Sequence, residues 1–314
     1  MNKIEFGDCR ETMRKWKEQG IKAQTCVTSP PYFGLRDYGH DGQIGLEQTP
    51  EEYIAAMVEV FRCVWDVLAD DGTLWLNIGD SYASAGGAQV EQTVRGDNNY
   101  VNSGQLGATG VGTTRKPPQG YKQKDLIGIP WMLAFALRAD GWYLRQDIIW
   151  HKPNPMPESV QDRCTKAHEY IFLMSKSQKY YYDHDAIKEP LKGEPEVRNK
   201  NAEGYQADYA HGDRFSKGER VFGADGMANK RSVWTVNTKP YKGAHFAVFP
   251  SDLIEPCIIA GAPVGGIVLD PFMGSGTTAQ VAQNLGRQYL GCELNPEYEK
   301  LQKKRLSQMS LELD

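Results

Sequence analysis

The amino-acid sequence predicts an α/β fold built on a doubly wound, mostly parallel β-sheet. Short apolar runs that indicate strands alternate with segments in which apolar residues repeat at helical spacing. Such alternation is typical of a parallel sheet that helices cover on both faces. With 314 residues, 40% of them hydrophobic and 24% charged, the chain can form one large domain or one domain with an insertion.

The individual helices and strands are predicted from the spacing of apolar residues, from helix-capping residues and from turn residues. Thr49 and Glu52 form the pattern of a capping box, with Pro50 at the first helical position. The sequence Asp70-Asp71-Gly72 is expected to stop the helix that begins there. Further helices are expected at residues 9–18, 129–139, 250–260 and 277–285, with a charged closing helix from Pro296. Strands are expected at residues 3–6, 24–27, 73–78, 144–150, 169–175, 267–269 and 288–292.

Two segments interrupt this alternation. Residues 84–124 are rich in Gly, Asn, Gln and Thr, show no periodicity and are too long for an ordinary connection. They predict a mobile functional loop or a disordered insertion. Residues 188–242 are polar, contain many Lys and Arg residues and are punctuated by aromatic residues. A solvated surface insertion is the alternative interpretation of both segments, and composition does not decide between the two.

Cysteine use, hydropathy and charge argue against several classes of protein. The six cysteines are scattered without a CxxC pair, which argues against a zinc site or a disulfide framework and fits a reducing cytosol. The N-terminal stretch has no signal-peptide core, and no run of apolar residues is long enough to span a bilayer. No metal is expected. Because the net charge is −4, any positively charged surface that binds nucleic acid must be confined to one part of the protein.

A glycine-rich turn follows the strand expected at residues 267–269. The stretch GGIVLDPFMGSGTT, residues 265–278, takes a strand directly into a turn and a helix, where open α/β sheets bind nucleotide-like ligands. A phosphate-binding loop would need GxxxxGK[ST], and no lysine follows these glycines. A dinucleotide fingerprint is closer, since Gly274, Gly276 and Ala279 match GxGxxG/A and Glu293 ends the next strand. A tight turn without a ligand is the remaining alternative.

The acidic residues around this turn favour another ligand. Asp270, at the end of the strand, is a poor neighbour for a pyrophosphate but suits a cationic amino group. S-adenosylmethionine combines such an amino acid with an adenosine ribose. Its ammonium is expected near Asp270, its carboxylate near the helix that begins after Gly276, and its ribose hydroxyls against Glu293.

The stretch TSPPY, residues 28–32, suits chemistry on the exocyclic amine of a nucleobase. That amine is a poor nucleophile because its lone pair is delocalised into the ring. Two acceptors that bind its hydrogens favour the tetrahedral nitrogen of the transition state, and Ser29 Oγ and the Pro30 carbonyl can be those acceptors. Pro31 restricts Pro30 to an extended conformation, and Tyr32 can stack on a base that has left the duplex.

These motifs together resemble those of the β group of DNA amino-methyltransferases, in which the catalytic motif precedes the cofactor motif. TSPPY resembles the catalytic motif, DPFMGSGTT the methionine-binding motif and GCELNPEY the ribose segment. FGDC and HFAVFP resemble two further cofactor-binding segments, and the Asp of the first would meet the adenine amino group. The resemblance implies a Rossmann-like methyltransferase fold and catalytic roles for Ser29, Pro30, Pro31 and Tyr32. It implies that S-adenosylmethionine is bound by Asp8, Cys9, His245, Phe246, Phe249, Pro250, Asp270, Pro271, Phe272, Gly274, Ser275, Gly276, Thr277, Glu293 and Asn295.

The same resemblance implies a domain organisation and a partner. In the family the variable region reads DNA sequence, which assigns residues 188–242 to target recognition. Residues 1–187 and 243–314 would then be the catalytic and cofactor-binding halves of one core. Double-stranded DNA is the implied partner, and a cognate restriction endonuclease and a homodimer are further options. The resemblance also implies a cytoplasmic enzyme that is bacterial or is encoded by a phage in a bacterial host. The residues expected to contact DNA are Arg36, Arg115, Lys116, Lys230 and Arg231.

The residue before Pro-Pro bears on which base is methylated. Family members with Asp or Asn there are mostly adenine-N6 enzymes, whereas Ser is typical of cytosine-N4 enzymes, and GLRDY, residues 34–38, also resembles the cytosine-N4 group. We therefore expect cytosine-N4 methylation, with adenine-N6 as the alternative. Cytosine-C5 chemistry would need a cysteine nucleophile that this motif does not supply. Outside this class, a nicotinamide-dependent oxidoreductase and a catalytically silent DNA-binding protein are the alternatives.

Overall fold

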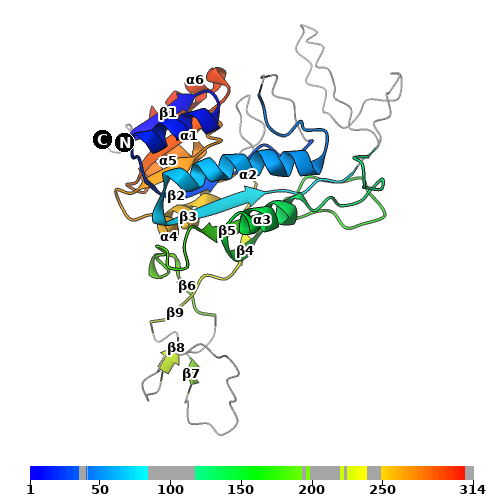
Figure 1. Ribbon diagram of the computed structural model, residues 1–314. Coiled ribbons are helices and arrows are strands. Elements are labelled where there is room, and N and C mark those ends of the chain that lie inside the picture. Colours follow the sequence, from blue (N-terminus) through cyan, green and yellow to red (C-terminus); the bar gives the residue numbers. More distant parts are fainter. Residues whose placement is uncertain are drawn as a thin grey trace.

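An eight-stranded sheet forms the centre of the protein, in the order β1-β12-β11-β2-β3-β5-β4-β10 (Figure 1). The structure is a computed structural model that describes residues 1–34, 40, 42–83, 117–192, 196–198, 220–222, 225–238 and 249–307. The strands of this sheet are β1 Asn2–Phe6, β2 Ala23–Thr28, β3 Leu68–Ile78, β4 Tyr143–His151, β5 His168–Ser175, β10 Val233–Thr235, β11 Ile267–Asp270 and β12 Gln288–Glu293.

The sheet is mostly parallel, as the sequence predicts. Within it, β5 runs antiparallel to its neighbours β3 and β4, and all the other pairs are parallel. The strands β11 and β2 are neighbours in this order. After β2 the chain continues to β3 on one side, and after β11 it continues to β12 on the other. The carboxyl ends of β2 and β11 therefore form the topological switch point at which open α/β sheets bind ligands.

Helices cover both faces of the sheet (Figure 1). They are α1 Cys9–Glu18, α2 Pro50–Val67, α3 Ile129–Ala139, α4 Ser251–Gly261, α5 Thr277–Asn284 and α6 Glu299–Ser307. Successive residues of β3 point to opposite faces, so that Leu74 and Leu76 pack with α1, α2 and α3 while Trp75 packs with α4 and α5. None of the helices in the described ranges is both long and apolar enough to cross a bilayer.

The boundary between α2 and β3 differs from the prediction. The capping box at Thr49 is present, but the helix ends at Val67, and β3 begins at Leu68. The sequence Asp70-Asp71-Gly72 thus lies inside the strand and does not stop the helix. The reason is pairing and burial: Leu68 is completely buried and lies opposite Ala23 in the ladder with β2. Burying this side chain and pairing its backbone outweigh the helical spacing of the preceding residues.

Strand pairing involves the flanks of the first interrupting segment and part of the second. Tyr82 and Leu126 form an antiparallel bridge, which brings together the two ends of the 84–124 segment, whose residues 84–116 lie outside the described ranges. In the 188–242 segment β10 is the edge strand of the central sheet. Two small sheets lie away from the central sheet (Figure 1) and pair β6 Glu189–Pro190 with β9 Met227–Ala228 and β7 Glu196–Arg198 with β8 Arg220–Phe222.

Candidate active site

Four neighbouring strands carry the predicted site residues at one edge of the sheet. Asp8 follows β1, Glu293 ends β12, Asp270 ends β11 and Ser29 follows β2, and these strands are adjacent and parallel. Because carboxyl ends of parallel strands meet at the same edge, residues far apart in sequence converge here. The structure therefore brings the expected catalytic and cofactor segments together.

The glycine-rich turn after β11 has the conformation that its glycines permit. Gly274 and Gly276 have φ of 53° and 87°, a left-handed backbone that other residues rarely adopt. Gln302 Nε2, from α6, donates to the Gly274 carbonyl at 2.7 Å, and Arg305 donates to the hydroxyl of Thr277. The turn is thus held by its own glycines and by the closing helix.

Glu293 reaches under this turn from the end of β12. Its two carboxylate oxygens accept from the backbone N–H of Gly274 at 2.7 Å and of Asn295 at 2.8 Å. Burial raises the pKa of Glu293 to about 7, and the negative charge of Asp270 adds to this rise, whereas the backbone donors oppose it. A carboxylate with two backbone donors keeps lone pairs for the hydroxyls of a bound ligand.

Asp270, the residue expected near a ligand ammonium, is buried at the end of β11. It is 1% exposed and accepts from Thr28 Oγ1 at 2.7 Å, Thr278 Oγ1 at 2.6 Å and the backbone N–H of Phe272 at 3.0 Å. Burial raises its pKa to about 6, although these three donors favour the ionised form. This carboxylate therefore ties β2, the turn and α5 together, and its expected contact with a ligand ammonium stays a prediction.

The structure describes most of the remaining expected cofactor residues. Asp8 caps α1 by accepting from the backbone N–H of Arg10 at 2.7 Å, and the Arg10 guanidinium lowers the pKa of this carboxyl. Cys9 is buried beside Cys292. Phe249 and Pro250 lie directly before α4, and Asn295 accepts from the backbone N–H of Glu297. Their contacts with a cofactor stay predictions, and His245 and Phe246 lie outside the described residues.

The TSPPY corner leaves β2 beside this turn. Pro30 is buried, Ser29 and Pro31 are half-buried, and the hydroxyl of Tyr53 in α2 donates to the Pro31 carbonyl at 2.9 Å. Tyr32 is also half-buried, and its ring lies so close to Gly79 that a Cβ on that glycine would be 2.7 Å from Tyr32 Cε2. The corner is therefore held rigidly at the carboxyl end of β2.

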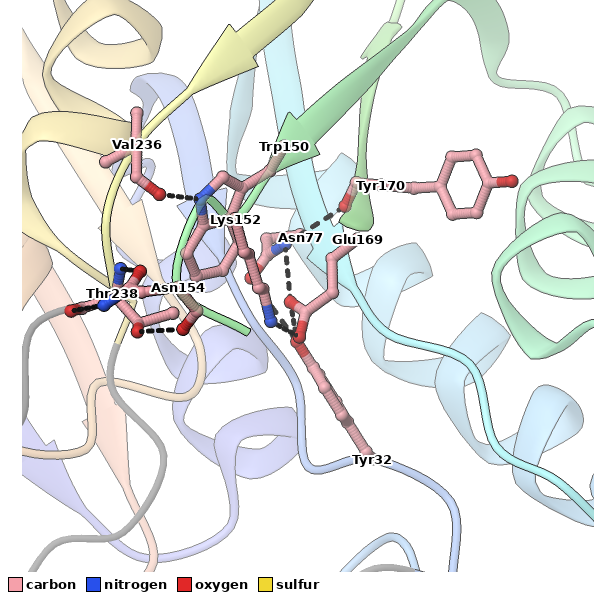
Figure 2. A network of polar contacts seen from close by, with 9 residues as sticks. All are labelled: Tyr32, Asn77, Trp150, Lys152, Asn154, Glu169, Tyr170, Val236 and Thr238. Carbon is pink, nitrogen blue, oxygen red and sulfur yellow. Dashed lines mark hydrogen bonds and ion pairs between the residues drawn. The ribbon is translucent and has the colours of Figure 1, made fainter. Parts of the chain in front are cut away.

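A polar network surrounds the hydroxyl of Tyr32 (Figure 2). Tyr32 Oη donates to Glu169 Oε2 at 2.7 Å, and Asn77 Nδ2 contacts the same oxygen at 3.3 Å. Lys152 forms an ion pair with the other carboxylate oxygen of Glu169. Burial raises the pKa of Tyr32 well above its usual range, and the Glu169 charge adds to this, while the Ser29 hydroxyl opposes it. The phenol therefore stays protonated and acts as a donor.

Of the residues expected to contact DNA, Lys230 and Arg231 are described. They precede β10 and line an open pocket of about 660 Å³ that also includes Glu189, Trp234 and Asp252. The Lys230 ammonium lies 5.2 Å from the centre of the Trp234 ring, and Arg231 pairs with Glu189. Arg36, Arg115 and Lys116 lie outside the described residues. Among the residues that the structure describes, no group of three or more His, Cys, Asp or Glu side chains could hold a metal ion.

Glu169, Lys152 and Asn77 are not among the site residues that the sequence predicts. Glu169 lies at the start of an expected strand, whereas site residues are expected at the carboxyl ends of strands. Since β5 is antiparallel, its beginning lies at the same edge as the carboxyl ends of its neighbours. The acidic residue that opens this strand is the signal, but its meaning depends on strand direction, which the sequence does not reveal.

Comparison with known proteins identifies the family. A family model for DNA methylases of the N6 and N4 type matches residues 23–304. Type II methyltransferase M.SmaI of Serratia marcescens is 49% identical over 97% of this chain and 90% of its own length, and M.Cfr9I of Citrobacter freundii is 46% identical over 93% and 83%.

Solved structures show the same fold. The PvuII DNA methyltransferase described as cytosine-N4-specific has a TM-score of 0.61 at 17% identity, covering 97% of this chain and 86% of that one. A putative DNA modification methylase of Thermus thermophilus, complexed with S-adenosyl-L-methionine, has a TM-score of 0.56 at 22% identity, covering 98% and 94%. The fold is thus the Rossmann-like methyltransferase fold, and the protein belongs to the N6/N4 DNA methylase family.

Proposed function

We propose that the protein transfers a methyl group from S-adenosylmethionine to the N4 amine of cytosine in duplex DNA. The observation that carries this proposal is the juxtaposition of the TSPPY corner and the glycine-rich turn at the carboxyl ends of the adjacent strands β2 and β11. One site can thereby hold a flipped base and a methyl donor side by side. Family membership supports DNA as the substrate, and the two type II relatives support a restriction–modification context with a cognate endonuclease.

The residues around the turn fit S-adenosylmethionine. Among the described residues, the Ser275 hydroxyl is buried, at 1% exposure, without a hydrogen-bond partner, so the turn has an unused polar group for a ligand. The N-terminus of α5 suits a carboxylate, and Glu293 suits ribose hydroxyls. The cofactor supplies a methyl group on a sulfonium. Asp270 acts indirectly, by holding the turn in place.

The TSPPY corner prepares the amine. Ser29 Oγ and the Pro30 carbonyl accept the two amine hydrogens and draw the nitrogen lone pair out of conjugation with the ring. Tyr32 offers its ring as a platform for the extruded base. Because Tyr53 and Gly79 hold this corner, the acceptors are oriented before the base arrives.

Cytosine is preferred to adenine on two grounds. Serine stands before Pro-Pro, as is typical of cytosine-N4 enzymes, and a protein of the same fold is described as cytosine-N4-specific. The experiment that tests the activity supplies S-adenosylmethionine with a labelled methyl group and unmethylated plasmid DNA. We expect the label in the DNA. Unlabelled DNA with a cofactor-bound protein would favour a silent DNA-binding protein instead.

The affinity for S-adenosylmethionine should depend on pH through Glu293. Ribose hydroxyls donate to the ionised carboxylate, and its pKa is raised to about 7, so binding must release a proton below this pH. Affinity should rise roughly tenfold between pH 6 and pH 8. In Glu293→Gln, calorimetry should find weaker binding of S-adenosylmethionine. The tenfold rise in affinity should be absent, although Asp270 can still titrate in this variant. An equally steep rise in the variant would remove Glu293 from the site.

Lys230 and Arg231 should contribute to DNA binding. The ion pair of Arg231 with Glu189 is exposed and contributes little, so the guanidinium can exchange this partner for a phosphate. The double charge reversal Lys230→Glu, Arg231→Glu should weaken DNA binding and lower the salt slope by roughly two units, since each lost phosphate contact removes about 0.9.

A matched control for this test is available on α1. Arg14 and Lys15 are exposed, and their reversal to Glu changes the net charge by the same amount. If both double variants change the DNA affinity and the salt slope equally, the effect comes from total charge. Residues 230–231 would then be ordinary solvated surface residues without a role in DNA binding.

A further inference from the structure

We propose that Glu169 and Lys152 are positioning residues that fix Tyr32 as the platform for the target base. This inference rests on the proposed function of Tyr32. It concerns a pair of oppositely charged residues that lie beside the catalytic corner, on β5 and directly after β4.

Glu169 gathers three donors at the end of the Tyr32 side chain (Figure 2). The phenol and the Asn77 amide share Oε2, at 2.7 and 3.3 Å, and Lys152 occupies Oε1. The Glu169 and Lys152 side chains are only 15% and 17% exposed, so water screens this pair weakly. A hydrogen bond from a neutral phenol to a charged acceptor is stronger than one to a neutral acceptor. Glu169 therefore fixes the position of the Tyr32 hydroxyl, at the far end of the ring.

A second contact fixes one edge of the same ring. The absent side chain of Gly79 allows the ring to lie against the backbone, because a Cβ there would be 2.7 Å from Cε2. The ring is thus held both by its hydroxyl and by one edge. A side chain constrained in this way loses little conformational entropy when a base stacks on it, so the platform is pre-organised.

Lys152 pairs with Glu169 and connects it to neighbouring residues at the same edge of the sheet. Its ammonium lies 4.3 Å from the centre of the Trp150 ring, and Trp150 Nε1 donates to the Val236 carbonyl at 2.8 Å. Two residues later, Asn154 and Thr238 exchange hydrogen bonds of 2.9 and 3.1 Å (Figure 2). The position of Lys152 is therefore tied to the chain that leaves β10, where the predicted target-recognition segment returns to the core.

The experiment measures single-turnover methyl transfer to plasmid DNA with saturating enzyme, together with the affinities for S-adenosylmethionine and DNA. Glu169→Gln keeps the size of the side chain, but its amide group cannot accept from three donors. We expect the rate to fall on the order of tenfold to a hundredfold, as for a misplaced reacting group, with cofactor affinity unchanged. Lys152→Met, which keeps an apolar stem beside Trp150, should lower the rate in the same way.

Two controls separate positioning from folding. Lys17 and Asp66 form an ion pair 2.8 Å long between α1 and α2, and Lys17→Met and Asp66→Asn remove comparable charges there. They should leave the rate unchanged. Thermal melting of every variant sets an assay temperature at which all are folded.

A double-mutant cycle with Tyr32→Phe decides the question. If Glu169 acts through the phenol, Glu169→Gln should slow Tyr32→Phe no further, because the contact is already lost. Rate losses that multiply, or a Glu169→Gln enzyme that transfers at the parent rate, would overturn the inference. In either case a parent enzyme that methylates DNA leaves the proposed function standing, whereas a parent that methylates no base removes both.

Discussion

Ser29→Ala should lower the rate of methyl transfer about a hundredfold or more while leaving the affinities for DNA and S-adenosylmethionine nearly unchanged. The hydroxyl accepts an amine hydrogen most strongly when the nitrogen becomes tetrahedral, so its loss affects the transition state more than the bound substrate. Losing one pre-organised hydrogen-bonding group of this kind typically costs a hundredfold to a thousandfold in rate. Single-turnover kinetics at saturating enzyme measure the chemical step separately from binding.

Tyr32→Ala provides the contrast. A stacking platform also holds the extruded base, so DNA affinity and rate should both fall, with the lost stack contributing about 1–3 kcal/mol. A Ser29→Ala enzyme that works at the parent rate would mean that the hydroxyl only caps the turn after β2. The mechanism would then be wrong, although the family assignment would stand.

Asp270→Ala should destabilise the whole fold and should not act only on cofactor binding. The substitution leaves the hydroxyls of Thr28 and Thr278 and the backbone N–H of Phe272 without their buried acceptor. Each unsatisfied buried group costs about 1–3 kcal/mol, so a loss of at least about 3 kcal/mol in the free energy of unfolding is expected. Chemical denaturation without cofactor measures this loss directly.

Asp71→Ala is the matched control, since Asp71 is an exposed aspartate of β3. Its free energy of unfolding should change by less than about 0.5 kcal/mol. If Asp270→Ala unfolded at the parent denaturant concentration but bound S-adenosylmethionine weakly, the carboxylate would be a direct ligand contact, as its place in the sequence first suggests.

The order of elements and the place of the site could be predicted from the sequence. A strand that ends in Asp270 and a glycine-rich turn, and another that ends in TSPPY, have local signals that survive folding: apolar runs, glycines and prolines. Parallel strands then bring these ends together without further information. The predicted helix at residues 9–18 has the same bounds as α1. Its signals are also local, since Asp8 caps it and its apolar residues repeat at helical spacing.

What could not be predicted depends on tertiary contacts. The direction of β5 decides that Glu169 lies at the active edge, and no local pattern encodes that direction. The burial of Asp270 depends on Thr28 and Thr278, which reach it from two other elements. Residues 233–235 are too short to show a period, yet they complete the sheet because Trp234 is buried against it.

The identity of the methylated base tests the central claim most directly. Plasmid DNA methylated by the parent enzyme is digested to nucleosides, which are separated by chromatography and identified by mass and fragmentation. Chromatography is needed because N4-methylcytosine and 5-methylcytosine have the same mass. We predict N4-methyldeoxycytidine, which Ser29→Ala should reduce in proportion to its rate. N6-methyldeoxyadenosine as the product would contradict the assignment of the base, and 5-methyldeoxycytidine would contradict the amine chemistry of the TSPPY corner.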